Sequence, residues 1–325
     1  MYRTILSIAY PVVFAIVFPV QLLLYYIIRR HSPRYLRRMK KVLEINCIMQ
    51  TYSLVTCCFL QTRQVSNLDP IEIWCYGPLR HQPAHILYSF YFGAQSATLT
   101  SVLLVFLTIY LKYEAVKNLT EARSRKYEII TILLSLVLLV TAAEISLILS
   151  ESLPPEAQEK FRILNKDTTD HSVIGYITLK TPESLLIFSI VSGSVILLSP
   201  IGLIIRWRIM TTVGASLGRI SSHRKMNTQS FINGLTLQAV LPFICFLPIF
   251  FCLFYLIKTK SELLIEQYGI GILTLIPALL DPFITLYSVT PYRKKVAVWL
   301  RLEKSNEQNV QVTAMAESHL PPMNS

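Results

Sequence analysis

The chain alternates between long apolar runs and short segments rich in basic residues. Seven of its apolar runs contain no Lys or Arg, although the chain has 31 of these residues in all. At a helical rise of about 1.5 Å per residue, each run is long enough to cross the roughly 30 Å hydrocarbon core of a bilayer. The predicted spans are Ile5–Ile28, Val42–Leu60, Ala84–Leu111, Tyr127–Leu149, Pro182–Ile205, Phe231–Ile257 and Tyr268–Thr290. The pattern predicts an all-α membrane protein, a bundle of seven transmembrane helices.

The chain divides into the bundle, residues 1–290, and a cytoplasmic segment, residues 291–325. In the first part of this segment Val296, Trp299 and Leu300 share one helical face between Arg and Lys residues. This spacing is typical of a short amphipathic helix that lies on a membrane surface. From Glu303 onward the tail is polar, which predicts disorder.

The composition changes this picture little. The chain is 53% hydrophobic and 15% charged, whereas an ordinary globular domain has about 25% charged residues. Its net charge of +12 could suggest nucleic acid, but nucleic-acid-binding proteins gather basic residues in one patch or stripe. Here they lie at the ends of the apolar runs, which favours contact with anionic membrane lipid and excludes nucleic acid as the expected partner.

The basic residues are shared unequally between the two sides of the membrane. Most lie in the first, third and fifth inter-helix loops and in the C-terminal tail. The first loop alone contains Arg29, Arg30, Arg34, Arg37, Arg38, Lys40 and Lys41. Because Lys and Arg are retained on the cytoplasmic side, the N-terminus is predicted to be extracellular and the tail cytoplasmic. The glycosylation sequence at Asn118 then lies in the cytoplasm and is expected to stay unmodified.

Two acidic residues lie deep in the predicted spans, Glu144 in the outer third of the fourth and Asp281 in the inner half of the seventh. A carboxylate in hydrocarbon is costly, so each should face the bundle interior, be paired or be protonated. Asp281 lies about 13 Å from the cytoplasmic end of its span, and Asn46 and Gln50 reach a similar depth in the second span. We therefore predict a polar cluster of Asp281, Asn46 and Gln50, which would act either as a switch network or as a packing network.

Prolines inside the last two spans extend the predicted switch network. Pro242 lies in the sixth span and Pro282 in the seventh. Each removes a backbone hydrogen bond and favours a kink. Small rotations at these kinks could open and close the cytoplasmic face. The receptor would then have two conformations, and a ligand could shift the equilibrium between them.

Glu144 is the leading ligand-binding candidate because it lies on the outer side, although it could instead reach the interface or bond a neighbouring Ser. The third span places Gln95, Ser96 and Thr98 near mid-membrane. The sixth span carries Phe243, Phe246, Phe250 and Phe254 close to one helical face, a stripe that is also typical of core or lipid contacts. The predicted ligand-binding residues are Glu144, Gln95, Thr98, Phe246 and Phe250.

The outer loops leave two questions open. The long polar stretch Ser150–Thr181 could cap the outer face as a lid or serve as a solvated connector. Cys75 in another outer loop could pair with Cys57 or Cys58, or it could be a free thiol.

Signatures of enzymes and cofactors are absent from the sequence. It contains no Walker A loop, no H-E-x-x-H motif and no His/Cys cluster at metal spacing. No predicted span contains lysine, which excludes a retinal Schiff base. We expect no catalytic residue, no metal and no cofactor.

Several segments resemble the nematode seven-transmembrane chemoreceptors of serpentine receptor class delta. The resemblance rests on the sequence blocks Tyr2–Pro11, Gln61–Asn67, Tyr76–His81, Lys225–Pro242 and Asp281–Arg293. It implies a G-protein-coupled receptor in the plasma membrane, at the cilium of chemosensory neurons, that detects a small environmental molecule. Helix three ends without the Asp-Arg-Tyr sequence of rhodopsin-like receptors, so their residue roles are not transferred to this chain.

The interpretation at this point is a receptor that binds a small-molecule ligand in the outer half of the bundle and engages a heterotrimeric G protein with its basic loops. The residues expected to face the G protein are Arg123, Arg125, Arg206, Arg208, Arg224 and Lys225. The alternative is that these basic residues only fix the orientation of the chain in the membrane and do not contact a G protein. The alternatives are a ligand-gated ion channel or transporter of seven-span type and, more remotely, an intramembrane hydrolase using Glu144 and Asp281.

Overall fold

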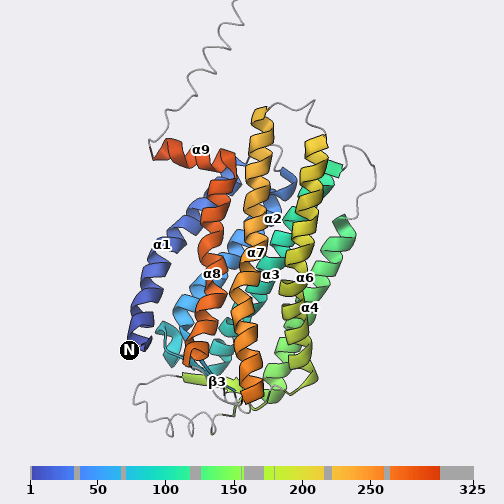
Figure 1. Cartoon of the computed structure of the whole chain (residues 1–325). Coiled ribbons are helices and arrows are strands. Elements are labelled where there is room, and N and C mark those ends of the chain that lie inside the picture. Colours follow the sequence, from blue (N-terminus) through green and yellow to red (C-terminus); the bar gives the residue numbers. More distant parts are fainter. Residues whose placement is uncertain are drawn as a thin grey trace, which may run out of the picture.

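The structure is a computed structural model that describes residues 2–32, 37–66, 71–117, 126–154, 156, 172–178, 180–215, 222–259 and 264–300. Its long helices run side by side (Figure 1), and seven of them are long and apolar enough to cross a membrane. They are α1 (Tyr2–His31), α2 (Arg37–Leu60), α3 (Ala84–Lys117), α4 (Lys126–Glu151), α6 (Pro182–Ala215), α7 (Ser222–Thr259) and α8 (Leu264–Ser288). The predicted seven-helix transmembrane bundle is confirmed.

Helix α3 is the central element of the bundle. It packs against α2, α4, α6 and α7, whereas α1 packs against α2 and α8, and α4 packs on the far side against α3 and α6. Large apolar side chains such as Leu138, Leu149 and Phe251 are exposed on the outer helices. This is the surface expected where hydrocarbon replaces water as the solvent.

The helices extend beyond the apolar runs that predicted them. Helix α1 continues through Arg29 and Arg30 in its last turn, and α6 continues to Ala215. Basic side chains in a last turn are favourable because they face the negative end of the helix dipole. The apolar runs therefore mark the membrane-spanning part of each helix and not its ends.

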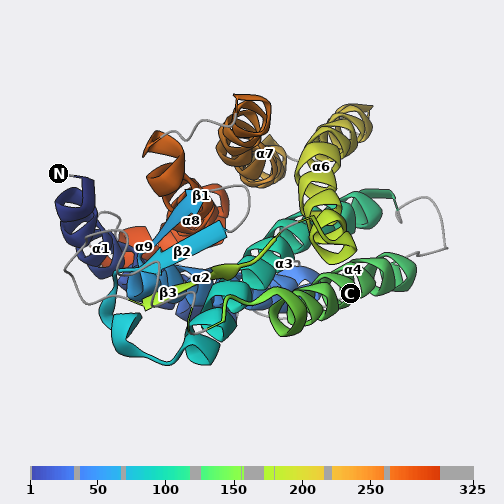
Figure 2. The same ribbon diagram turned by 90° about the horizontal axis from the view of Figure 1, so that it is seen from below.

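A small sheet, which the sequence did not predict, lies across one end of the bundle (Figure 2). Strands β1 (Thr62–Ser66) and β2 (Ile71–Cys75) come from the α2–α3 connection, and β3 (Ser172–Tyr176) comes from the α4–α6 connection. The strands are antiparallel in the order β1-β2-β3. We call this the sheet end of the bundle, where the N-terminus also lies.

The turn from α2 into the sheet has a simple local cause. Gln61 adopts a left-handed backbone with a φ of 48°, and its amide donates a hydrogen bond of 2.9 Å to the Cys57 carbonyl. Such a residue commonly ends a helix. The chain therefore leaves α2 at Leu60 and doubles back over the bundle as β1.

The sheet is fastened to the helices by side chains. Arg63 of β1 donates two hydrogen bonds, of 2.9 and 2.5 Å, to the side-chain oxygen of Gln267 in α8. Cys75 in β2 is buried and is a free thiol, as are the other five cysteines, so of the alternatives left open by the sequence the free thiol is the one present. Burial raises the pKa of the Cys75 thiol to about 12.

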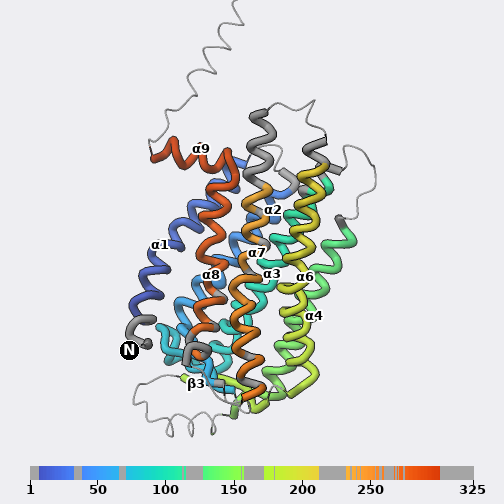
Figure 3. The backbone as a smooth tube through the Cα atoms, in the orientation of Figure 1, coloured from blue at the N-terminus to red at the C-terminus, as the bar shows by residue number. Residues whose placement is uncertain are grey.

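At the opposite end, α9 (Thr290–Trp299) turns away from the direction of α8 (Figure 3). Tyr292 is fully buried there, and its hydroxyl lies 2.7 Å from the Ser32 hydroxyl. Of the predicted apolar face, Val296 packs on the bundle core, while Trp299 and Leu300 remain exposed. The short helix after helix seven is thus present, and its contact with lipid stays a prediction. We call this the α9 end.

Candidate functional site

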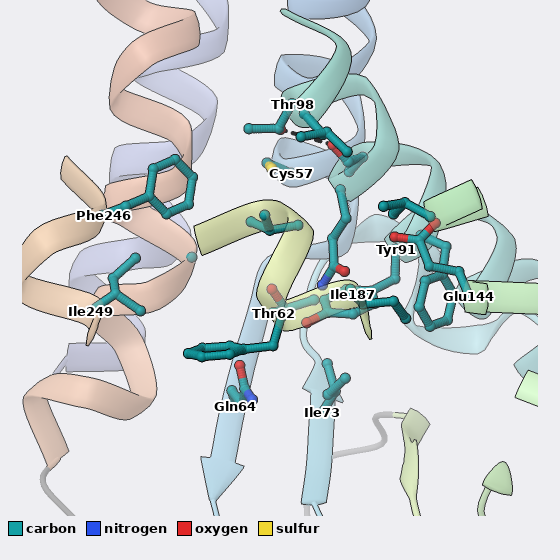
Figure 4. Close-up of a pocket in the computed structure, with 18 of the residues that line it drawn as sticks. Cys57, Thr62, Gln64, Ile73, Tyr91, Thr98, Glu144, Ile187, Phe246 and Ile249 are labelled. Atoms are coloured by element: carbon teal, nitrogen blue, oxygen red, sulfur yellow. Dashed lines mark hydrogen bonds between the residues drawn. The ribbon is translucent and has the colours of Figure 1, made fainter. Parts of the chain in front are cut away.

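A cavity of about 320 Å³ lies inside the sheet-end half of the bundle (Figure 4). Its walls come mainly from α3, α4, α6 and α7, and the sheet contributes to its outer boundary. All the residues predicted to bind a ligand line this one cavity: Gln95 and Thr98 from α3, Glu144 from α4, and Phe246 and Phe250 from α7. The structure brings these residues together, and their role in binding stays a prediction.

Glu144 lies on one wall of the cavity, close to Tyr91 (Figure 4). Its side chain is 2% exposed, and the Ser96 hydroxyl donates a hydrogen bond of 2.6 Å to one carboxylate oxygen. The bond to a neighbouring Ser that the sequence left open is therefore present, and Glu144 also lines the cavity, while its role in ligand binding stays a prediction.

An apolar wall lies on the α7 side. Phe246 and Ile249 are buried there, and Phe250 meets Phe188 of α6 edge to face with ring centroids 6.0 Å apart. Edge-to-face contact is a favoured arrangement of aromatic rings. Phe254 is 67% exposed and does not line the cavity. The aromatic stripe thus divides along its length into a cavity wall and an outward-facing end.

The sheet closes part of the cavity. Thr62 and Gln64 of β1, Ile73 of β2 and Tyr176 of β3 line it. Burial raises the pKa of Tyr176, with smaller contributions from nearby groups that include Tyr91 and Glu144. Its buried hydroxyl has no hydrogen-bond partner among the described residues. Tyr176 was not predicted as a lining residue, because the sequence left open whether the stretch Ser150–Thr181 covers the bundle or is a solvated connector.

Between the cavity and the α9 end lies a buried polar network centred on Asp281 of α8. One carboxylate oxygen accepts a hydrogen bond of 3.2 Å from the Asn46 side-chain amide, and the other accepts one from Gln238 of α7. The Gln238 amide also reaches the Thr285 hydroxyl at 2.7 Å. Asp281 is 3% exposed, so these amides satisfy a carboxylate that is removed from solvent.

The network continues into the other helices. The Gln50 side-chain amide donates to the Ser101 hydroxyl of α3 at 3.1 Å, and Ser101 donates to the Asn46 side-chain oxygen Oδ1 at 2.8 Å. Gln21 of α1 donates to Gln50 at 3.4 Å and to the backbone of α8 at 3.2 Å. Side chains of α1, α2, α3, α7 and α8 are therefore joined in one place. The structure brings the predicted Asp281, Asn46 and Gln50 together.

Gln238 and Gln21 are members of this network that the sequence reasoning missed. Each is an amide inside an otherwise apolar run, and that signal could have found them, because a polar side chain in a span usually faces the bundle interior. The two predicted prolines fall in the expected helices. Pro282 follows Asp281 within α8, and Pro242 lies within α7.

A smaller cavity of about 20 Å³ lies beside the network. Its lining includes Gln50, Ser53 and Asp281, and it shares Thr98 with the larger cavity. The Thr98 and Ser53 hydroxyls lie 3.1 Å apart. A polar cavity of this size has room for about one water molecule. Thr98 and Val102 line both cavities, so the larger cavity adjoins the smaller one at this part of α3.

The predicted G-protein-facing residues divide into three groups. Arg206 is half-buried near the α9 end, and its guanidinium donates to the side-chain oxygen of Asn233 at 3.1 Å. Arg208 is exposed. Arg224 and Lys225 lie in the first turns of α7, and their side chains are outside the described part of the structure. Arg123 and Arg125, like the glycosylation sequence at Asn118, lie outside the described residues.

Seven membrane-length helices, with a cavity toward the sheet end and a buried polar network next to it on the side of the α9 end, form the architecture of a seven-transmembrane protein such as a receptor. The chain matches the family described as serpentine type 7TM GPCR chemoreceptor Srd over residues 6–298, and it belongs to that family.

Relatives in Caenorhabditis elegans agree with this assignment. The chain is 51% identical to serpentine receptor class delta-47 over 305 residues, which cover 94% of this chain and 96% of that protein. It is 47% identical to serpentine receptor class delta-48 with the same coverage, and 43% identical to serpentine receptor class delta-45 over 94% and 95% of the two chains. The resemblance inferred from the sequence is confirmed.

Proposed function

We propose that the protein is a chemosensory G-protein-coupled receptor whose ligand, a small environmental molecule, binds in the large cavity. The observation that carries this proposal is that Thr98 and Val102 of α3 line both cavities, with the Thr98 hydroxyl 3.1 Å from the Ser53 hydroxyl. A ligand that displaces this part of α3 would also move Ser101, which bonds Asn46 and Gln50 of the network. Membership of a chemoreceptor family supports the same function.

The network is a suitable two-state element. Asp281 holds α2 through Asn46 and α7 through Gln238, so a shift of α3 at Ser101 changes the bonds that hold three other helices. A ligand biases such an equilibrium only as far as it binds the two states with different affinity. Pro242 and Pro282 would then allow α7 and α8 to bend as these bonds change.

The proposal places the sheet end outside the cell and the α9 end in the cytoplasm. The loops that contain most of the basic residues connect helices at the α9 end, as the positive-inside rule requires for the cytoplasmic side. A heterotrimeric G protein would bind there, in reach of Arg206 and Arg208. The expected location is the plasma membrane of chemosensory neurons, at the cilium.

Expression in cultured cells with a panel of volatile and soluble cues tests this function. We expect a second-messenger response that disappears when G proteins are blocked. An epitope placed at Met1 should be accessible on intact cells. A membrane current that persists with G proteins blocked, together with a hidden epitope, would overturn the proposal in favour of a ligand-gated channel.

A hydrolase has less support from the geometry. Glu144 lines the larger cavity and Asp281 the smaller one. Among the described residues, Glu144 bonds Ser96 whereas Asp281 bonds amides of α2 and α7. The two carboxyl groups therefore belong to separate polar clusters.

A further inference from the structure

We propose that the ligand of the large cavity is a small cationic amine with an apolar body, and that its ammonium group binds between Glu144 and Tyr176. This inference rests on the proposed function, because it names the chemical class of the molecule that the receptor detects. Four features of the cavity support it: its charge, its unsatisfied polar atoms, its shape and its closure by the sheet.

The cavity carries an acid without a base. Among the described residues that line it, Glu144 is the one carboxylic acid, and none is Lys, Arg or His. An ionised carboxylate that is 2% exposed has lost most of its hydration. Such a charge is stable in a low-dielectric site when a cation and hydrogen-bond donors surround it. Without a cation the carboxyl group would be protonated instead, so a ligand that supplies a positive charge is what allows Glu144 to ionise.

Hydrogen bonding at this wall is also incomplete. Ser96 donates to one oxygen of Glu144 at 2.6 Å, and it is the one side chain among the described residues that does so. Tyr176 is 5% exposed. Its hydroxyl is buried and has no hydrogen-bond partner among the described residues. Buried polar atoms normally have partners. Glu144 and Tyr176 line the same cavity, and an ammonium group there has three donors to offer these two acceptors.

The opposite wall selects an apolar body. Phe246 and Ile249 face the cavity from α7, across from Glu144 (Figure 4), and Phe250 with Phe188 forms an aromatic corner. A volume of about 320 Å³ is near the lower end of the roughly 300–1,000 Å³ range of ligand sites. The ligand is therefore small, with its charged group on the α4 side and its apolar part on the α7 side.

The sheet limits what can enter. Every residue of β2 is buried, as are Val173 to Tyr176 of β3, so these strands form a closed cover over part of the cavity. A large peptide would have to displace them. A small amine would not.

The test uses three probes of nearly equal shape: 2-phenylethylamine, 2-phenylethanol and phenylacetic acid. Their binding to the purified full-length receptor in detergent is measured by the shift in its melting temperature as a function of probe concentration. We expect the amine to act at concentrations about tenfold or more below those of the alcohol, and the acid to give no shift. Equal or stronger stabilisation by the acid, or no shift with any probe, would overturn the inference.

Variants identify the site. Glu144→Gln keeps the size of the side chain and removes its charge, and it should weaken amine binding by about 10- to 100-fold, the range expected for a charged hydrogen bond. Glu183→Gln is the matched control, because Glu183 is half-buried at the same end of the bundle but does not line the cavity. Tyr176→Phe should weaken the amine by a few-fold to tenfold and leave the alcohol less affected. Amine binding that is unchanged in both Glu144→Gln and Tyr176→Phe would contradict the inference.

The outcome can be separated from that of the proposed function. Amine binding by a receptor that never activates a G protein would support this site and refute the signalling role. A G-protein response to neutral or acidic cues that is unaltered in Glu144→Gln would support the signalling role and refute this ligand class.

Discussion

The Tyr88 hydroxyl of α3 lies 2.5 Å from the carbonyl oxygen of Gly175 in β3 and 2.9 Å from its backbone nitrogen. The phenol donates to the carbonyl and accepts from the amide. One side chain thus bonds both polar groups of a strand residue to the central helix, next to Tyr176, which lines the large cavity. Among the described residues no disulfide joins α3 to β3, because all six cysteines are free thiols. We infer that Tyr88 does the fastening that a covalent bridge would otherwise do.

Replacement of Tyr88 by Phe tests this fastening. It removes the hydroxyl and leaves the buried Gly175 amide without this acceptor, whereas the Gly175 carbonyl oxygen still accepts a hydrogen bond of 3.1 Å from the Leu153 amide. We expect the free energy of unfolding to fall by about 1–3 kcal/mol, the usual cost of a buried polar group left unsatisfied. The measurement is the melting temperature of the purified receptor. The matched control is Tyr255→Phe, because Tyr255 is 45% exposed; an equal effect of both changes would show that Tyr88 has no special role.

Gly175 itself is required by close packing. A Cβ atom at this position would lie 2.0 Å from the Ile71 carbonyl oxygen and 2.9 Å from a methyl group of Leu153. Gly175→Ala should therefore separate β3 from β2 and destabilise the receptor by about 1–3 kcal/mol or more, as overpacking does. Thermal unfolding and the amount of receptor at the cell surface measure the effect.

Gly193 provides the control for that change. It lies in α6, and a Cβ atom there would meet nothing within 4 Å. Since Ala is favoured over Gly in a helix by about 1 kcal/mol, Gly193→Ala should leave the melting temperature unchanged or raise it. A loss of stability as large as that of Gly175→Ala would point to a general intolerance of substitution and away from the strand contact.

The fold was predictable where a property of consecutive residues determines it. Each spanning helix satisfies its backbone hydrogen bonds within itself, so an apolar run without charge suffices to identify it. The sheet is different, because β2 pairs Glu72 and Ile73 with residues about 100 positions later in the chain. No local pattern contains that register.

The candidate site divides in the same way. Glu144 and Asp281 stood out because a carboxylate inside an apolar run is rare, and their depth followed from helical rise. Tyr176 did not stand out, because it reaches the cavity only through the pairing of β3. Gln238 was overlooked since amides in a span are less conspicuous than acids, although it bonds the same carboxylate as Asn46.

The burial of Cys75 gives a chemical test of the sheet. Its side chain is fully buried and its thiol pKa is raised to about 12 by that burial, whereas an ordinary thiol has a pKa near 8.5. Because the thiolate is the reactive form, a receptor whose other cysteines are replaced should resist N-ethylmaleimide at pH 8 until it is denatured. Gln82→Cys in a receptor without other cysteines is the exposed control and should react at once. Rapid labelling of native Cys75 would mean that the sheet does not cover it.

The network around Asp281 can act as a switch or simply as packing, and one pair of substitutions separates the two roles. The carboxylate accepts from both Asn46 and Gln238, so Asp281→Asn leaves a single acceptor oxygen for two donors and must break or weaken one bond between helices. A bond of this kind contributes about 1–3 kcal/mol, and we expect the basal second-messenger level or the half-maximal cue concentration to change by about tenfold while surface expression stays near the original level. Adding Asn46→Asp to the same receptor exchanges the carboxylate and the amide between positions 46 and 281, so that they can bond again, and it should restore much of the signalling. Asn46→Asp alone places two acids together and should disturb signalling most. The three receptors are compared by flow cytometry of a surface epitope and by a second-messenger assay. Signalling that is the same in all of them, at equal surface expression, would leave the network with a packing role only.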